Sequence, residues 1–476
     1  MSATSHRRLA RALSRAGLHV DHADGVFTVR LAARPDAPPF EILLPDELPL
    51  EPKALHQLAA VAGIHHPSGG RLDHVCATPD FHPGDGGVPI GTVAASRSLV
   101  VPGLVGGDIN CGMRLHVTDL GLDRFLAHKP KLVAALRGDY LLGTRDIALR
   151  GAALTATLRE GLPGYLAEGT VRRSGLLARV DHARLEAELD RVFDAGQLTL
   201  GDETIVPEAL REPDVMVREE GLATIGRGNH FVEVQVVDEV VDRARAWQWG
   251  VKQGQVALMI HSGSREVGRA VGALWAQRAR EAWPASHRYP EGRIFPLCRK
   301  ERPDLVAAYL SAEAAAAHYA FLNRALLAEL FRDRLASVVG DVDAPLVYDV
   351  PHNLTLVEDG LTVARKGATP ARPEQPVLIP GSMGASSFLL VGKGAPRWCA
   401  SASHGAGRAR SRMDMSHLPA SELGLGGVEC HTLRDERRVE EAPAGYKSIH
   451  AVIDAQVRAG MVGVVARLRP LMTFKA

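Results

Sequence analysis

The stretch GGDINCGMRL, residues 106–115, places Asp108 and Cys111 between paired glycines, just ahead of an apolar run. Glycine permits tight turns and lets the backbone approach a ligand closely. A carboxylate and a thiol three residues apart can lie on one side of such a turn, and both are metal ligands. The stretch also fits an ordinary turn, because Asp is common in turns and Cys is often buried. Residues elsewhere in the chain decide between a simple turn and half of a metal site.

Three histidines stand where an apolar strand opens into a loop. His230 precedes the alternating run FVEVQVV, His261 follows the apolar run VALMI, and His352 follows LVYDVP. One such histidine is usually structural, but three of them together with Asp108 and Cys111 favour a transition-metal site. The ligand types alone favour zinc. The chain has no CxxC pair and no HExxH helix, so the spacing by itself specifies no known metal motif.

Two glycine-rich segments near the C-terminus have the chemistry of phosphate binding. In SASHGAGRARSR (401–412), His404 precedes GAG and three arginines follow. Imidazole can attack phosphorus, and arginine stabilises the charge that develops; the alternative is a solvated basic turn. In PGSMGASSFLLVG (380–392), backbone N–H groups and hydroxyls can cradle a phosphate, although no Walker lysine follows.

The segment TPDFHPGDGGVPIG (78–91) consists of residues typical of turns, and we predict a loop. It offers Asp80, His82 and Asp85. We interpret Asp80 or His82 as a group that orients a substrate or a proton, with turn capping as the alternative.

Bulk composition excludes several classes of protein. The chain has 476 residues, of which 46% are hydrophobic and 23% charged, and a formal net charge of +1. Nucleic-acid binding would therefore need a local basic patch. Five scattered cysteines form no disulfide framework, which favours a reducing compartment. No run of 18 apolar residues and no signal peptide is evident. We predict a cytoplasmic protein without a membrane span.

The candidate residues spread from 80 to 475, which favours one large domain in which distant segments converge. Strand-like and helix-like stretches are mixed, and 304–339 has the clearest helical pattern. We therefore predict an α+β fold. Residues 1–49 form an N-terminal extension, with a helix over 6–18 and strands over 25–33 and 40–44. Residues 50–476 form the main domain, and the family resemblance given next implies that it is the catalytic domain.

Taken in order, these segments resemble the RtcB family of RNA ligases. The resemblance runs from about residue 50 to the C-terminus. It rests on nine motifs: PDFHPGDGGVPIG, GGDINCGMRL, GRGNHFVEVQ, HSGSR, VPHN, PGSMGASSF, SHGAGRARSR, EAPAGYKS and VARLRPLMTFK. It implies an RtcB-type fold, in which mixed sheets flanked by helices surround a central metal cleft.

The resemblance implies a ligase of RNA repair or tRNA splicing. Such an enzyme joins RNA 3′-phosphate or 2′,3′-cyclic phosphate ends to 5′-hydroxyl ends, using GTP and two Mn(II) ions. A histidine becomes a covalent guanylate, and the guanylate then passes to the RNA 3′-phosphate. The ligand types favour zinc, but the resemblance implies manganese, and we adopt manganese. Ligand softness determines how tightly a metal binds, whereas the metal found in a site also depends on which metal the cell supplies.

Matching motifs assign each role by position. His404 would be the guanylylated nucleophile, with Asp80, Arg265 and Arg412 in the catalytic set. The resemblance implies that Cys111, His261 and His352 hold one metal and that Asp108, Cys111 and His230 hold the second, so that Cys111 bridges. The implied guanylate contacts are Asn229, Glu233, Ser382, Ser387, His404, Gly407, Tyr446 and Lys475.

Two alternatives stay open at this point. One is a metal-dependent phosphoesterase on the same site, and the other is a non-catalytic paralogue that binds RNA ends. No implied ligand or nucleophile is missing, which disfavours the paralogue. We expect a monomer that does not bind membranes, and an accessory activator is compatible with the resemblance.

Overall fold

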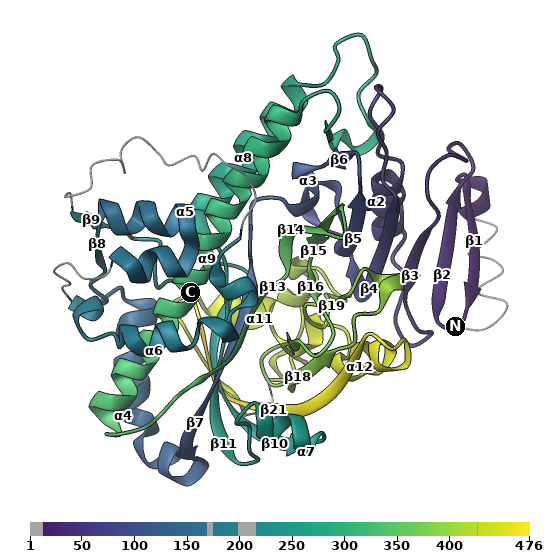
Figure 1. Cartoon of the computed structure of the whole chain (residues 1–476). Coiled ribbons are helices and arrows are strands. Elements are labelled where there is room, and N and C mark those ends of the chain that lie inside the picture. The colour runs from purple at the N-terminus through teal and green to yellow at the C-terminus, as the bar shows by residue number, and fades with distance from the viewer. Residues whose placement is uncertain (1–12, 169–174, 199–215, 426) are drawn as a thin grey trace.

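Two large β-sheets organise the chain (Figure 1). The structure is a computed structural model that describes residues 13–168, 175–198, 216–425 and 427–476. The first sheet has the strand order β1(Leu18–Ala23), β2(Val26–Leu31), β3(Phe40–Leu43), β4(His74–His82), β5(Ile90–Ser96), β15(Leu361–Lys366) and β14(Asn353–Glu358). The second has the order β13(Leu346–Pro351), β7(Gly112–Gly121), β11(Gln255–Ser262), β10(Phe231–Val240), β21(Val462–Lys475), β18(Ser387–Gly392) and β17(Pro376–Ile379), with β20(Glu429–Thr432) beside β21.

Helices pack around these sheets and between them. The longer ones are α2(Pro52–Ala62), α4(Leu122–Leu141), α5(Gly151–Ala167), α8(Arg265–Glu281), α9(Pro303–Val338) and α12(Ile449–Arg458). The short ones are α3(Pro102–Val105), α6(His182–Ala187), α7(Arg243–Gln248), α10(Arg412–Ser416) and α11(Asp435–Glu440). Two-stranded ribbons pair β6(Leu99–Val100) with β12(Leu297–Cys298), β8(Ala148–Arg150) with β9(Met216–Arg218), and β16(Ala368–Pro370) with β19(Ser401–Ser403). This confirms the α+β prediction.

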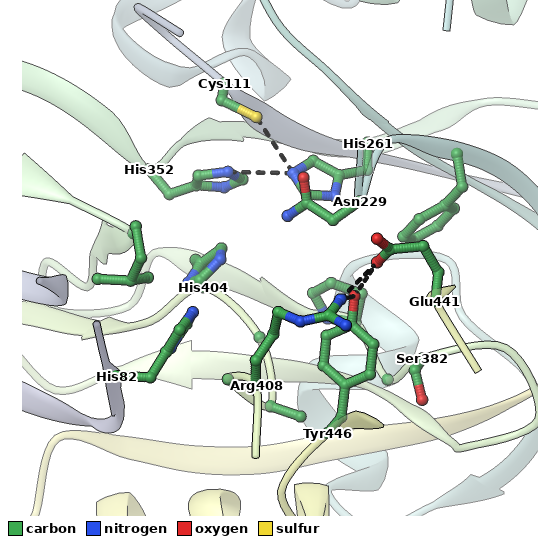
Figure 2. Close-up of a pocket in the computed structure, with 18 of the residues that line it drawn as sticks. His82, Cys111, Asn229, His261, His352, Ser382, His404, Arg408, Glu441 and Tyr446 are labelled. Carbon is green, nitrogen blue, oxygen red and sulfur yellow. Dashed lines mark hydrogen bonds and ion pairs between the residues drawn. The ribbon is translucent and has the colours of Figure 1, made fainter. Parts of the chain in front are cut away.

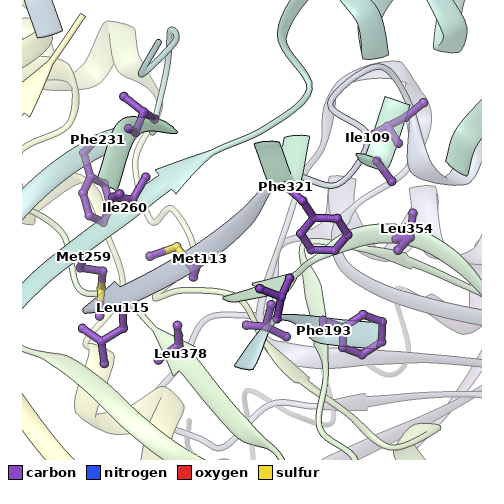
Figure 3. Packing of buried hydrophobic residues seen from close by; sticks show 14 of the residues in the cluster. Ile109, Met113, Leu115, Phe193, Phe231, Met259, Ile260, Phe321, Leu354 and Leu378 are labelled. Atoms are coloured by element: carbon purple, nitrogen blue, oxygen red, sulfur yellow. The ribbon is translucent and has the colours of Figure 1, made fainter. Parts of the chain in front are cut away.

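Helix α9 is the central helix of the core. Most of its side chains are buried, and Phe321 lies among apolar residues of several other segments, including Ile109 and Leu354 (Figure 3). Among the described residues, α9 alone is long and apolar enough to cross a membrane, but 83% of its most apolar window is buried inside the protein. Burial on all sides explains why apolar residues occur on every face of this helix, and its buried charged residues, such as Glu313 and Arg324, are hydrogen-bonded inside the core.

The N-terminal strands continue the first sheet. β3 pairs in parallel with β4, so that Phe40 lies opposite Val75, and β1 and β2 extend the sheet to its outer edge (Figure 1). The strands predicted over 25–33 and 40–44 are confirmed as β2 and β3. Residues 6–12 of the predicted N-terminal helix lie outside the described residues. Leu18, assigned to that helix, begins β1 instead.

The predicted loop over 78–91 is wrong at both ends, because β4 runs to His82 and β5 begins at Ile90. Residues up to His82 belong to β4, whose central side chains are buried. The turn-like composition misled because Pro79 lies where the pairing of β4 with β5 shifts register, between Ala77 and His82. An irregular stretch of ladder tolerates a residue that has no N–H to donate.

Candidate active site

Four strands of the second sheet bring their ends to one edge. β7 begins at Gly112, and Gly112 lies opposite Ser262 of β11 and Pro351 of β13. Phe231, the first residue of β10, lies opposite His261. Because the strands are antiparallel, starts and ends alternate along this edge. Residues just outside each strand are therefore collected in one place.

A thiol, a carboxylate and three imidazoles meet at this edge. The Cys111 sulfur lies 3.1 Å from Nε2 of His230 and 3.2 Å from Nε2 of His261. Nε2 of His261 lies 3.1 Å from Nε2 of His352, and Nε2 of His230 lies 3.0 Å from Oδ2 of Asp108. Donor atoms of Cys111, His230 and His261 all lie within 4.8 Å of one another. All five metal ligands implied by the sequence are thus brought together.

The donor set fits a cation. Burial raises the pKa of the Cys111 thiol, and the charge of Asp108 raises it further, so the thiolate form would need a bound cation beside it. Burial likewise lowers the pKa of His261 and of His352, so both imidazoles are held neutral. Nδ1 of His230 faces the backbone oxygen of Ile225 at 3.1 Å, which leaves the Nε2 lone pair directed at Cys111. Metal-bound histidines are commonly oriented by such a bond on the other ring nitrogen.

A glycine makes room for the cluster. A Cβ on Gly263 would lie 2.4 Å from Oδ1 of Asp108 and 3.1 Å from the Cys111 Cα. Any side chain at this position would displace the carboxylate from His230. Gly263, two residues beyond His261, therefore has a packing role at the site.

His404 lies beside this cluster with its orientation fixed. Its Nδ1 lies 2.6 Å from Oδ2 of Asp80. Its ring centre lies 4.8 Å from that of His352, and Figure 2 shows these two imidazoles beside each other. Asp80 is fully buried; burial alone would raise the pKa of its carboxyl, but hydrogen bonds from His404 and Thr78 outweigh this and lower it. An ionised carboxylate on Nδ1 leaves the lone pair on Nε2. The arrangement suits an imidazole nucleophile.

The residues around His404 form a cavity of about 380 Å³. A Cβ on Gly407, whose φ is +74°, would lie 2.2 Å from the Asp80 carbonyl oxygen, so only glycine fits there. The predicted residues that line the cavity are His82, Asp85, Asp108, Cys111, Asn229, Glu233, His261, His352, Ser382, His404, Gly407, Arg412, Tyr446 and Lys475.

Two buried groups at the floor of the cavity have shifted pKa values. Burial raises the pKa of Glu233 to about 7, and its carboxyl accepts hydrogen bonds from Thr473 and Gln235. Burial lowers the pKa of Lys475, whose Nζ donates to the His230 carbonyl oxygen at 3.3 Å.

Four predicted residues lie outside the cavity lining. Asp80 and His230 contact the lining residues His404 and Cys111, and the other two are Ser387 and Arg265. Ser387 is buried at the start of β18, and its hydroxyl accepts from the Gly381 N–H at 3.2 Å, so it supports the 380–386 loop. Arg265 lines an adjacent cavity, where its Nε donates to Thr224 Oγ1 at 3.0 Å.

Sequence reasoning left three cavity residues without a role. Glu441 accepts from Arg408 at 3.2 Å, from Arg412 at 3.0 Å and from the Tyr446 hydroxyl (Figure 2). Glu441 is the first residue of the motif EAPAGYKS, and this motif was the only feature of the sequence that pointed to it. Lys366 and Asn353 also line the cavity. Asn353 directly follows His352, whereas Lys366 ends β15 without any local motif.

Comparisons with known proteins agree with this geometry. The family model described as tRNA-splicing ligase RtcB matches residues 57–476. The RNA-splicing ligase RtcB of Mycobacterium tuberculosis is 36% identical over 436 residues, covering 84% of this chain and 96% of the relative. The tRNA-splicing ligase RtcB of Archaeoglobus fulgidus is 34% identical over 472 residues, covering 90% and 92%. That of Pyrobaculum aerophilum is 32% identical over 443 residues, covering 83% and 86%.

The matched region contains every strand end that supplies the site, from β4 to β21. Both the extent of the match and the level of identity are those of a family member. The chain belongs to the RtcB family of tRNA-splicing ligases.

Proposed function

We propose that the protein is a GTP- and Mn(II)-dependent RNA ligase. It joins RNA 3′-phosphate or 2′,3′-cyclic phosphate ends to 5′-hydroxyl ends, in RNA repair or tRNA splicing. Family membership supports the ligase class. The observation that carries the mechanism is the 2.6 Å bond between Nδ1 of His404 and the buried Asp80, beside a cluster of metal-binding side chains.

His404 is the proposed nucleophile. Its Nε2 attacks the α-phosphorus of GTP, an N–P bond forms, and the bond to the leaving pyrophosphate breaks. Asp80 stabilises the positive charge that develops on the imidazole. The guanylate then passes to an oxygen of the RNA 3′-phosphate, and a 5′-hydroxyl displaces GMP to form the phosphodiester.

The metal ligands are assigned to two Mn(II) ions. Cys111, His261 and His352 would hold one ion, and Asp108, Cys111 and His230 the other. This assignment is supported by Cys111, whose sulfur contacts a histidine of each set at 3.1–3.2 Å. When bound, the ions would neutralise phosphate charge during transfer.

The remaining cavity residues would bind the guanylate and the RNA. Glu233 is buried among hydrogen-bond donors and suits recognition of a base edge, whereas Ser382, Gly407 and the Ser387-supported loop suit a phosphate. Tyr446, Asn229 and Lys475 complete the lining of the guanylate site. Arg412 faces the cavity and Arg265 faces its neighbour, so we assign Arg265 to RNA outside the guanylate site.

Intact-mass spectrometry after incubation with GTP and Mn(II) tests the proposal. We expect the wild type to gain one guanylate, and His404→Ala to gain none while keeping its circular dichroism spectrum. His417→Ala is the matched control, because His417 is exposed, and should gain the adduct normally.

The alternatives predict other outcomes of the same experiment. A metal-dependent phosphoesterase would release phosphate from RNA 3′ ends without forming an adduct. A paralogue that only binds RNA ends would show neither product. A wild type that forms no adduct would overturn the ligase mechanism.

A further inference from the structure

Two cysteines outside the active site lie in contact. Cys76 lies within β4 and is fully buried, whereas Cys399 lies in the turn before β19 and is partly exposed. Their thiols are hydrogen-bond partners, and both side chains belong to one hydrophobic cluster. They are separated by more than 300 residues of chain, so the contact is created entirely by the fold.

An imidazole and a guanidinium lie beside Cys399, and the guanidinium of Arg365 is also paired with Glu358 at 2.6 Å. The His74 side chain is a hydrogen-bond partner of the Cys399 thiol. Arg365 is buried, and its Nη2 donates to the Cys399 carbonyl oxygen at 2.8 Å while its Nη1 has no hydrogen-bond partner among the described residues. The hydrogen bond with Cys76, and next the one with His74, lower the pKa of Cys399; the same bond raises the pKa of Cys76.

The backbone holds Cys399 in an uncommon conformation. Cys399 and Ala400 both lie in the left-handed region, with φ of 47° and 44°. Such strain in consecutive non-glycine residues persists only where the surroundings impose it, and it is common at functional sites. A metal role is not indicated, because Cys111, His230 and His261 alone among the described residues bring three donor atoms within 4.8 Å.

We propose that Cys399 and Cys76 are a reversible oxidation site that takes a peroxide and closes to a disulfide. The Cys399 thiolate attacks a peroxide oxygen, the O–O bond breaks, and Cys399 becomes a sulfenic acid as the other oxygen leaves as water or an alcohol. The Cys76 sulfur then attacks the Cys399 sulfur. An S–S bond forms, the S–O bond breaks, and the oxygen leaves as water with the Cys76 proton.

The disulfide would join two segments of the active site. Four residues beyond Cys76, β4 reaches Asp80; five residues beyond Cys399, the chain reaches His404 after β19. The cross-link would therefore tie the strand that carries Asp80 to the segment that carries His404. The oxidation chemistry itself is independent of the proposed ligase activity.

Peroxide treatment followed by denaturing alkylation and peptide mapping tests the proposal. We expect the wild type to lose two hydrogens and to yield a Cys76–Cys399 cross-linked peptide that dithiothreitol cleaves. Cys298→Ser, which removes a buried cysteine elsewhere, should still cross-link. A wild type without the cross-link, or one that joins either cysteine to Cys111 instead, would overturn the proposal.

Single variants separate the role of Cys399, which attacks the peroxide, from that of Cys76, which closes the disulfide. Cys76→Ser should stop at a sulfenic acid on Cys399 that dimedone captures, whereas Cys399→Ser should give neither product. Before oxidation, native alkylation at pH 7 should modify Cys399 about tenfold faster than Cys430, which has a similar exposure but a pKa raised by burial. Equal rates at the two cysteines would contradict the attacking role of Cys399.

Discussion

At the scale of single residues, Asp80 decides what His404 can do. Oδ1 of Asp80 accepts from Thr78 Oγ1 at 2.6 Å, and Oδ2 accepts from both Nδ1 and the backbone N–H of His404. All three of these groups donate hydrogen bonds to Asp80. A carboxylate, which only accepts hydrogen bonds, fits these surroundings better than an amide does. The hydrogen bonds that hold the side chain thus also hold its negative charge.

Asp80→Asn should slow formation of the guanylate adduct by a factor of about 100 or more. The amide carries no negative charge to stabilise the cation that develops on the His404 imidazole, even if its NH₂ group faces the Thr78 hydroxyl and its oxygen still accepts from Nδ1 of His404. Mass spectrometry over a time course measures the rate. Asp85→Asn, an exposed acid at the rim of the same cavity, should react like the wild type. Equal rates for Asp80→Asn and wild type would refute the role of Asp80.

Cys111→Ser should lower the manganese content at both proposed sites. A neutral serine hydroxyl is a much weaker ligand than a thiolate, and Cys111 contacts the histidines of both ligand sets. Metal analysis of the purified protein measures the ions bound per chain, with Cys298→Ser as the control. If Cys111→Ser retains one full equivalent, Cys111 does not bridge.

At the scale of elements, α9 carries a buried acid whose ionisation opposes folding. Glu313 is fully buried, and burial raises its pKa to about 7, while its Oε1 accepts from the Thr355 N–H at 2.7 Å. The pKa of Glu313 is higher in the folded state than in the unfolded state. Its contribution to the free energy of unfolding is therefore fully present below about pH 4.5, where the acid is protonated in both states. This stability is lost as pH rises to about 7.

Glu313→Gln should remove that part of the pH dependence. Relative to the variant, the wild type should lose about 3 kcal/mol of unfolding free energy between pH 4.5 and pH 8, as an upper bound for a shift of this size. Glutamine keeps an oxygen for the Thr355 N–H but has no charge to bury. Denaturant unfolding at both pH values checks this, and a constant difference between the two proteins would contradict it.

Secondary structure was predictable where the pattern is local. The helix over 304–339 and the VALMI strand are confirmed as α9 and β11, because side-chain periodicity and propensity act over a few residues. Residues 78–82 were mistaken for a loop, because a proline and turn-forming residues outweighed the burial of β4. Residues 78–82 continue a strand that pairs with β3 and β5 up to Ala77 and rejoins β5 at His82.

At the scale of the whole molecule, the N-terminal strands complete the first sheet. β3 covers one edge of β4, and Phe40 and Ile42 are fully buried. The family match begins only at residue 57. The proposed boundary at residue 49 therefore separates segments that share a sheet.

Deleting residues 1–49 should expose the β4 edge together with its apolar contacts. We expect the melting temperature to fall by at least about 5 °C and aggregation to increase. Deleting only residues 1–12, which leaves β1 to β3 in place, is the control and should have a smaller effect. Differential scanning calorimetry and light scattering measure both. An unchanged melting temperature after the longer deletion would show that the extension is dispensable.

The sequence by itself determined the residue types of the site and their places beside strands. Glycine, apolar runs and isolated histidines are local signals, and they were sufficient to select Asp108, Cys111, His261 and His404. The tertiary structure decided which atoms meet: Asp80 with His404 across 324 residues, and Cys111 with His230 across 119. Glu441 and Lys366 became visible only there. Such contacts depend on sheet register and strand order, which join segments too far apart for any local pattern to encode.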